Sequence, residues 1–192
     1  MKDNIKQNLE QISQNFILLQ KQIDIIVQIA QIWIESLANG NKVIFCGNGG
    51  SAADSQHLAA ELMGRYKIDR NPMPAMSLTV DTSALTAIGN DYGYEKVFSR
   101  QLRGIAKKGD VLVGISTSGN SKNIIEAFQI AHSLGVKTVA FTGEGGGRMK
   151  EEADICLNVP STIINNIQEM HIASGHIICG LVEAHFFANK QA

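Results

Sequence analysis

Residues 111–121 have the sequence VLVGISTSGNS, an apolar run followed by a turn rich in serine and glycine. Residues 42–51, KVIFCGNGGS, repeat this design: the run 42–46 precedes the glycine-rich turn 47–51. An amphipathic segment follows each turn. Each pattern predicts a strand, a tight turn and a helix start, where backbone N–H groups and the helix dipole favour an anion. Two such turns in one chain predict a pocket for a phosphorylated small molecule.

The remainder of the chain continues this alternation of short apolar runs and helical patterns. Five runs have strand composition: 42–46, 75–80, 111–115, 137–141 and 155–159. Helical patterns lie between and after them: 51–64, about 94–107, 121–134 and 163–187. This order predicts a parallel sheet with helices on both faces, whose ligands bind at the carboxyl ends of the strands. The glycine-rich residues 143–147 also follow a strand, and we expect only a flexible turn there.

The N-terminal residues 1–38 form a separate arm without glycine or proline. Apolar residues recur in it at alternating spacings of four and three, which is a heptad seam. The seam consists of Ile5, Leu9, Ile12, Phe16, Leu19, Ile23, Ile26, Ala30 and Trp33. One interpretation is one or two helices that cover the sheet of their own subunit. We favour the other interpretation, in which helices are shared between subunits.

Composition places the chain among ordinary globular proteins. A length of 192 residues with 44% hydrophobic content predicts one domain, residues 1–192, and a net charge of -1 predicts no nucleic-acid partner. We expect no membrane partner and no signal peptide, because no apolar run approaches the length of a membrane span and the first residues lack an apolar core. Cys46, Cys156 and Cys179 are too scattered for a disulfide framework, so we expect reduced thiols and a cytoplasmic protein.

A dinucleotide site is an alternative interpretation of the first turn. Gly47, Gly49 and Ala52 fit the pattern G-x-G-x-x-G/A after a strand. That fingerprint also needs an acidic residue at the end of the next strand to hold a ribose. The nearest candidate, Asp69, lies in a segment with loop composition, and the second polar turn has no role in such a site. We therefore set this alternative aside.

Titratable residues on two predicted helices are candidates for chemistry. His57 and Glu61, four residues apart, share a helix face and could bind a divalent metal or carry out acid–base work. Their spacing alone favours a simple surface pair. The last helix carries Gln168, His171 and His176, and periodicity does not choose between the two histidines.

The ordered motifs resemble those of the phosphoheptose isomerase family, within the sugar-isomerase (SIS) domain superfamily. The similarity covers essentially the whole chain. The matching stretches are CGNGGS (46–51), HxxxELxGRY (57–66), GNDYG (89–93), GDVL (109–112), GISTSGNS (114–121) and IQEMH (167–171). The resemblance implies an α/β three-layer sandwich around a five-stranded parallel sheet with flavodoxin-like winding. It also implies an N-terminal helical arm, residues 1–38, and a homotetramer with active sites between subunits.

The same resemblance implies an aldose–ketose isomerase that acts on a phosphorylated seven-carbon sugar, sedoheptulose 7-phosphate, with one zinc ion per subunit. Glu61 and His176 would be the catalytic pair. The implied zinc ligands are His57, Glu61, Gln168 and His176. The implied substrate-binding residues are Asn48, Gly49, Gly50, Ser51, Glu61, Asn90, Asp91, Ser116, Thr117, Ser118, Ser121 and Gln168.

One departure from the family pattern is Asn165, where some members carry an acidic residue three positions before the glutamine. The main rival function comes from proteins of the same superfamily that bind the bacterial replication initiator and lack the catalytic pair. Because this chain has both Glu61 and His176, we favour the enzyme. Another phosphosugar isomerase or sensor of the superfamily is a third interpretation.

Overall fold

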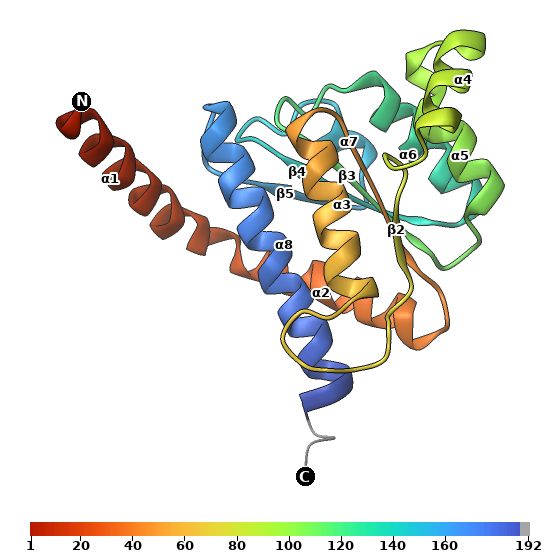
Figure 1. Ribbon diagram of the computed structural model, residues 1–192, viewed down its shortest axis with the longest axis horizontal. Coiled ribbons are helices and arrows are strands. Elements are labelled where there is room, and N and C mark those ends of the chain that lie inside the picture. Colours follow the sequence, from red (N-terminus) through yellow and green to blue (C-terminus); the bar gives the residue numbers. More distant parts are fainter. Residues whose placement is uncertain (189–192) are drawn as a thin grey trace.

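A five-stranded parallel sheet forms the centre of the protein, described here by a computed structural model that covers residues 1–188. The strands are β1 (Val43–Gly47), β2 (Ala75–Ser77), β3 (Val111–Ser116), β4 (Lys137–Thr142) and β5 (Ile155–Asn158). Their order is β2-β1-β3-β4-β5, so the winding reverses between β1 and β3 (Figure 1). The predicted α/β fold class with flavodoxin-like winding is confirmed.

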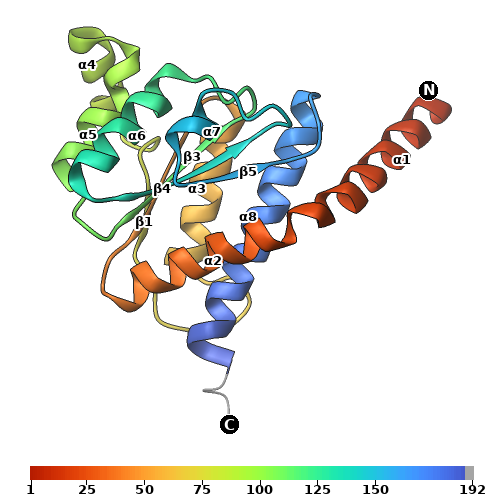
Figure 2. The ribbon, with the colours of Figure 1, turned by 180° about the vertical axis from the view of Figure 1, so that it is seen from behind.

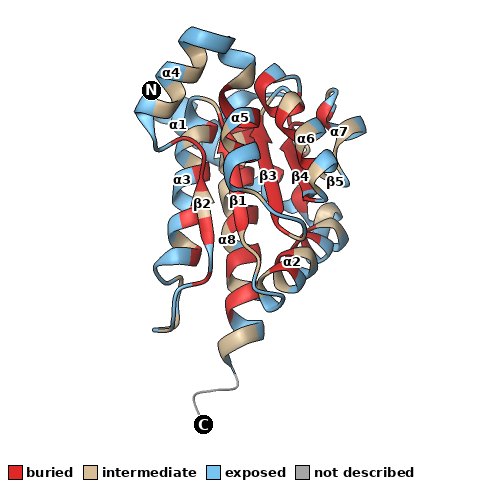
Figure 3. Ribbon diagram, turned by 90° about the vertical axis from the view of Figure 1, so that its right-hand side faces the viewer, coloured by how far each residue is buried: buried red, intermediate tan, exposed pale blue. Residues whose placement is uncertain are grey.

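Helices cover both faces of this sheet, as the alternation of strands and helices predicted. One face packs against α2 (Ile23–Ala38), α3 (Gly50–Met63) and α8 (Ile164–Phe187). The other packs against α5 (Val97–Ile105), α6 (Lys122–Leu134) and the short α7 (Met149–Glu152). Successive strand residues alternate between the two cores: Phe45 faces the first and Ile44 the second. The strands between these layers are largely buried (Figure 3).

Helices α3 and α8 lie side by side and run in the same direction (Figure 1). A Cβ atom on Gly50 would come within 2.4 Å of the Gln168 side chain, and one on Gly175 within 2.5 Å of Leu58. These two glycines therefore permit the close approach of the helices at two levels. As a result, the first turn of α3 faces the start of α8, and the later turns of both helices also face each other.

The arm is a continuous helical segment made of α1 (Lys2–Leu19), a 3₁₀ turn (Gln20–Gln22) and α2. Its heptad seam divides into two parts. Ile26, Ala30 and Trp33 are buried against the sheet of their own subunit, whereas Ile5 and Leu9 are more than half exposed. Figures 1 and 2 show α1 projecting away from the rest of the molecule. The interpretation that the arm covers the sheet of its own subunit is therefore confirmed for the second half of the seam, whereas sharing between subunits stays a prediction for the exposed half.

By length and composition alone, the 37-residue helix Lys2–Ala38 is also apolar enough to cross a membrane, with a hydropathy of 1.3 over an 18-residue window. The expectation that no apolar run approaches the length of a membrane span therefore does not hold for this helix. One such helix is weak evidence for a membrane span, because the core helix of a soluble protein passes the same test. The inner face of α2 packs on the sheet, while 28% of the tested window is buried.

Two local expectations were wrong. Strand β2 ends at Ser77 instead of residue 80, whereas the helical pattern expected at about 94–107 is confirmed as a 3₁₀ turn (Tyr94–Lys96) followed by α5. The expected pattern also omitted α7 and α4 (Thr82–Tyr92). Helix α4 has no fully buried residue, and its apolar stripe is short: Leu85 and Ile88, three residues apart, pack partly buried against the second core. Its start is marked by Asp81, whose carboxylate accepts the N–H of Ala84 at 2.9 Å.

Candidate active site

A small polar pocket lies where the β1–α3 and β3–α6 turns meet, at the point where the strand order reverses. Its volume is about 120 Å³. The residues that line it are Asn48, Ser51, Ile115, Ser116, Thr117, Ser118, Ser121 and Gln168. Hydroxyl and amide groups dominate this lining, and no charged side chain belongs to it. Such neutral donors at helix starts suit a phosphate group.

The serine-rich turn of the pocket is held by the glycine-rich segment 143–147. The Gly143 N–H donates to the Thr117 carbonyl at 3.1 Å. Gly119 has a φ of +64°, and a Cβ atom there would lie 2.1 Å from the Gly146 carbonyl oxygen. Segment 143–147, which we expected to be only a flexible turn, therefore packs backbone against backbone on the turn that forms the pocket.

The glycine-rich turn after β1 supplies the second wall. The Asn48 side chain forms a pair of amide hydrogen bonds with Asn123, at 3.0 and 2.8 Å, and accepts a third from the Tyr94 hydroxyl at 3.1 Å. Gly49 adopts a φ of +57° as the N-cap of α3, a conformation that disfavours a side chain. Gly50 leaves space for the Gln168 amide to reach the first turn of α3.

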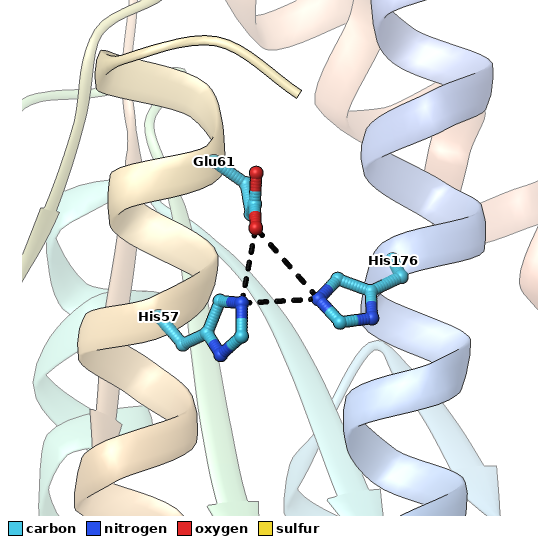
Figure 4. Close-up of side chains that lie close together, drawn as sticks. All are labelled: His57, Glu61 and His176. Atoms are coloured by element: carbon cyan, nitrogen blue, oxygen red, sulfur yellow. Dashed lines mark hydrogen bonds and ion pairs between the residues drawn. The ribbon is translucent and has the colours of Figure 1, made fainter. Parts of the chain in front are cut away.

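Further along the same helix pair, two residues of α3 meet one of α8. His57 Nε2 lies 3.0 Å from Glu61 Oε1, and His176 Nε2 lies 3.1 Å from His57 Nε2 and 3.8 Å from Glu61 Oε1. Figure 4 shows the three side chains converging on one point between the helices. We call these residues the trio. The pair expected from spacing alone is thus joined by a third group from another element.

The geometry of the trio fits a divalent metal. In a tetrahedral zinc site, ligand atoms about 2.0–2.1 Å from the metal are roughly 3.3 Å from one another. The three separations of 3.0, 3.1 and 3.8 Å scatter around this value, and the ligand atoms lie within 4.8 Å of one another. Two imidazoles and one carboxylate are also a common catalytic zinc set, which leaves a coordination position open.

The pKa of His176 reflects this setting. Partial burial lowers it below the ordinary histidine value, the neighbouring His57 lowers it further, and Glu61 opposes both. The imidazole of His176 therefore favours the neutral form, which is the form that binds a metal.

The two histidines of the last helix, between which periodicity did not choose, have different environments. His176 faces α3, whereas His171 is completely buried and its ring lies 5.8 Å from that of Phe141. Burial lowers the pKa of His171 to about 4, and the backbone of Thr142 only partly opposes the shift. Within the described residues, neither ring nitrogen has a hydrogen-bond partner of normal geometry. His171 is therefore a core residue.

Gln168, expected as the fourth metal ligand, lies elsewhere. It precedes His176 by eight residues on α8, which is roughly 12 Å along the axis. Its side chain lines the pocket and contacts the Gly50 backbone. Within one chain, the structure brings together three of the four expected ligands and places Gln168 in the polar pocket.

Asn90 and Asp91 are also outside the pocket. Both are exposed on the last turn of α4, and the Asn90 side chain donates to Asp91 at 2.8 Å. Asn165 is exposed on the first turn of α8, with its side chain bonded to Asn166. The structure of one chain therefore gives these three residues no contact with the trio.

Two residues near the trio were not singled out from the sequence. Asp54 precedes His57 by three residues on α3, and its buried Oδ2 has no hydrogen-bond partner within the described chain. Burial raises the pKa of Asp54, although the nearby His57 opposes the shift. The ring of Tyr66 stacks on that of His176 with centroids 5.8 Å apart and planes at 23°. The spacing of three residues between Asp54 and His57 could have indicated Asp54. No local sequence signal indicates that Tyr66 stacks on His176.

The sheet order, the paired polar turns and the helix-borne trio define a SIS-domain protein. The family model described as SIS domain matches residues 4–143. A phosphoheptose isomerase from Akkermansia muciniphila is 59% identical over 97% of this chain and 99% of its own length. One from Rhodospirillum rubrum is 52% identical over 95% and 97%. The structure of phosphoheptose isomerase GmhA from Neisseria gonorrhoeae superimposes with a TM-score of 0.90 at 42% identity, covering 95% of this chain and 98% of that one. The chain belongs to the phosphoheptose isomerase family.

Proposed function

We propose that the protein converts sedoheptulose 7-phosphate to D-glycero-D-manno-heptose 7-phosphate, an aldose–ketose isomerisation. The observation that carries the proposal is the trio placed beside a phosphate pocket on one helix pair. The relatives named phosphoheptose isomerase support the same substrate. The reaction would be the first step toward ADP-heptose for lipopolysaccharide core or capsule, and we propose that it takes place in the cytoplasm.

The pocket and the trio are spaced for such a substrate. Ser116, Thr117, Ser118 and Ser121 would bind the phosphate, together with the α3 start at Asn48, Gly49, Gly50 and Ser51. His57 follows Ser51 by six residues, or roughly 9 Å along α3. An extended seven-carbon sugar phosphate can span this distance. Its reacting C1 and C2 would then lie at the trio, while the phosphate supplies binding energy remote from the chemistry.

The isomerisation removes a proton from C1 of the ketose and delivers a proton to C2. Glu61 is the proposed base: its Oε1 faces both histidines, so its second oxygen is the one that would take the proton. His176 would move a proton between the oxygens on C1 and C2. A zinc ion held by His57, Glu61 and His176 would supply Lewis-acid polarisation of the carbonyl. A carboxylate bound to zinc is a poorer base. If one Glu61 oxygen binds the metal and the other takes the proton, Glu61 can serve in both roles.

We propose one zinc ion per subunit, with Gln168 as a ligand only if another subunit supplies it. Asn90 and Asp91 likewise keep a substrate-binding role only if a movement of α4 or a neighbouring subunit brings them to a sugar. These assignments agree with the proposed homotetramer with active sites between subunits, in which residues 1–192 act as one SIS domain and residues 1–38 as its oligomerisation arm.

The exposed half of the arm tests the proposed assembly. Changing Ile5, Leu9 and Phe16 together to Asp should reduce the tetramer to smaller species by light scattering, because these apolar side chains face outward. Leu19 is unsuitable for this test because it is buried in its own subunit. A matched control changes the exposed Gln7, Gln14 and Gln28 to Asp. A monomeric wild type would contradict the proposal.

The function itself is tested by incubating the protein with sedoheptulose 7-phosphate and following the products by NMR or mass spectrometry. We expect an aldoheptose 7-phosphate, formed at least about 100-fold more slowly by the Glu61→Gln variant. The rival function, binding of the replication initiator without catalysis, predicts no conversion by either protein. The trio, with Glu61 and His176 in contact distance, favours the enzyme over that rival.

A further inference from the structure

A buried ion pair lies directly behind the trio, between the loop that follows α3 and the last turns of α8. The side chains of Arg70 and Glu183 are only 1% and 2% exposed, with Arg70 Nε 2.9 Å from Glu183 Oε1. Buried charges are costly unless hydrogen bonds satisfy them. Glu183 accepts three more hydrogen bonds, from the consecutive backbone N–H groups of Tyr66, Lys67 and Ile68, at 3.1, 2.8 and 3.0 Å.

Arg70 connects this ion pair to the helix that carries Glu61. Its guanidinium donates to the carbonyl oxygens of Glu61 and Leu62, both at 2.9 Å, and more weakly to that of Gly64 at 3.3 Å. The carbonyls of Glu61 and Leu62 belong to the last turn of α3, where they have no partner within the helix, and Gly64 is the C-cap residue that follows. A cation there also complements the helix dipole. The position of the last turn, and with it Glu61, is thereby fixed relative to α8.

Glu183 connects the ion pair to the other half of the trio. The N–H that it accepts from Tyr66 fixes the start of the loop, and the Tyr66 ring stacks on His176. Gly180 makes space for this ring, because a Cβ atom there would lie 3.1 Å from it. The Glu183 carboxylate therefore fixes the backbone of Tyr66, whose ring packs on the imidazole of His176.

We propose that the Arg70–Glu183 pair and Tyr66 are positioning residues that hold Glu61 and His176 at metal-binding distance. The inference rests on the proposed metal site. Groups behind metal ligands that set ligand orientation commonly affect metal affinity by about 10- to 100-fold. A pair that served only the stability of the fold would leave metal affinity unchanged.

A matched control exists outside the α3/α8 pair, at the start of β3. Asp110 precedes β3 and is completely buried. It pairs with Lys42 Nζ at 2.6 Å and accepts the backbone N–H groups of Lys42 and Lys107 at 3.0 and 2.9 Å. Asp110→Asn and Glu183→Gln thus remove the charge from two similar buried carboxylates, only one of which lies behind the trio.

The test is a titration of metal-free protein with Co²⁺, followed by visible absorption, alongside denaturant unfolding. We expect both variants to lose stability but only Glu183→Gln to bind Co²⁺ at least about 10-fold more weakly. Tyr66→Leu, which leaves the ion pair intact, should weaken Co²⁺ binding similarly. Tyr66→Phe keeps the aromatic ring, so its Co²⁺ affinity should stay close to that of the wild type.

Wild-type Co²⁺ affinity in Glu183→Gln and Tyr66→Leu would overturn the inference and leave a purely structural ion pair. If Glu183→Gln does not fold, the comparison of Tyr66→Leu with Tyr66→Phe decides. Failure of the wild type to bind Co²⁺ would instead overturn the proposed metal site and the inference with it.

Discussion

The two ends of the α3/α8 pair are built in different ways. At the first end, the polar pocket proposed to bind the phosphate consists of neutral hydroxyl and amide groups on turns that hydrogen bonds and close glycine contacts hold in place. At the second end, the trio consists of titratable side chains that meet across two helices and remain partly exposed. The first arrangement suits a constant binding task, whereas the second suits proton transfer and metal binding. The comparison predicts that substrate binding and chemistry are separable along one helix pair.

The largest expected effect is at the chemical end. Glu61→Gln keeps the shape and helix propensity of the side chain but removes the base, so turnover should fall by at least about 100-fold. Because the pocket is untouched, substrate should still raise the melting temperature of the variant. A variant that loses binding together with turnover would show that the two ends are not separable.

Removal of a metal ligand should have the next largest effect. In His57→Ala, zinc content should fall from about one per subunit, with affinity lower by on the order of 100-fold, since even outer groups contribute 10- to 100-fold. Metal analysis after dialysis measures this loss, and His185→Ala, an exposed histidine on α8, is the control. Full activity of thoroughly metal-free wild type would contradict the metal proposal.

A smaller effect is expected at the phosphate end. Ser116→Ala removes one hydroxyl from the pocket, and a hydrogen bond to a charged group contributes about 1.5–3 kcal/mol. We expect kcat/KM to fall at least about tenfold, mainly through KM, in steady-state assays. Ser133→Ala, an exposed serine near the end of α6, should change neither parameter. A fall confined to kcat would mean that the pocket takes part in the chemistry.

The smallest effect on activity at neutral pH is expected at His171, which belongs to neither end. Its pKa of about 4 in the folded protein is below the ordinary value of 6.5, so protonation favours the unfolded state. Its contribution to the free energy of unfolding is complete above pH 6.5 and is lost as pH falls toward 4, by up to about 3 kcal/mol. His171→Met should flatten this dependence in denaturant titrations of metal-free protein. An unchanged slope of the free energy of unfolding against pH would contradict this prediction.

The fold could be predicted from the sequence to a large extent, because its signals are local. Five apolar runs predicted the five strands. The turns at 47–51 and 116–121 predicted the pocket, because each turn has its own local sequence signal. Helix α4 was missed because its apolar stripe is short, with Leu85 and Ile88 only partly buried against the core. The heptad seam could not reveal that the arm divides, since burial of Trp33 and exposure of Leu9 depend on where the sheet ends.

The candidate site was less accessible to sequence reasoning. The i, i+4 spacing brings His57 and Glu61 to one face, but nothing local states that His176 would meet them. That contact depends on the parallel packing of α3 and α8, which Gly50 and Gly175 permit. The same packing separates Gln168 from the trio, a consequence that the resemblance did not reveal. The roles assigned to these residues remain predictions.

The central claim is that Glu61 removes the C1 proton of a sugar whose phosphate is held at the other end of the helix pair. Its most direct test is the exchange of the C1 proton of sedoheptulose 7-phosphate with solvent deuterium, followed by NMR. The wild type should exchange at a rate comparable to turnover, and Glu61→Gln should bind the sugar while its exchange falls by at least about 100-fold. A variant that binds the sugar and exchanges at the wild-type rate would contradict the claim.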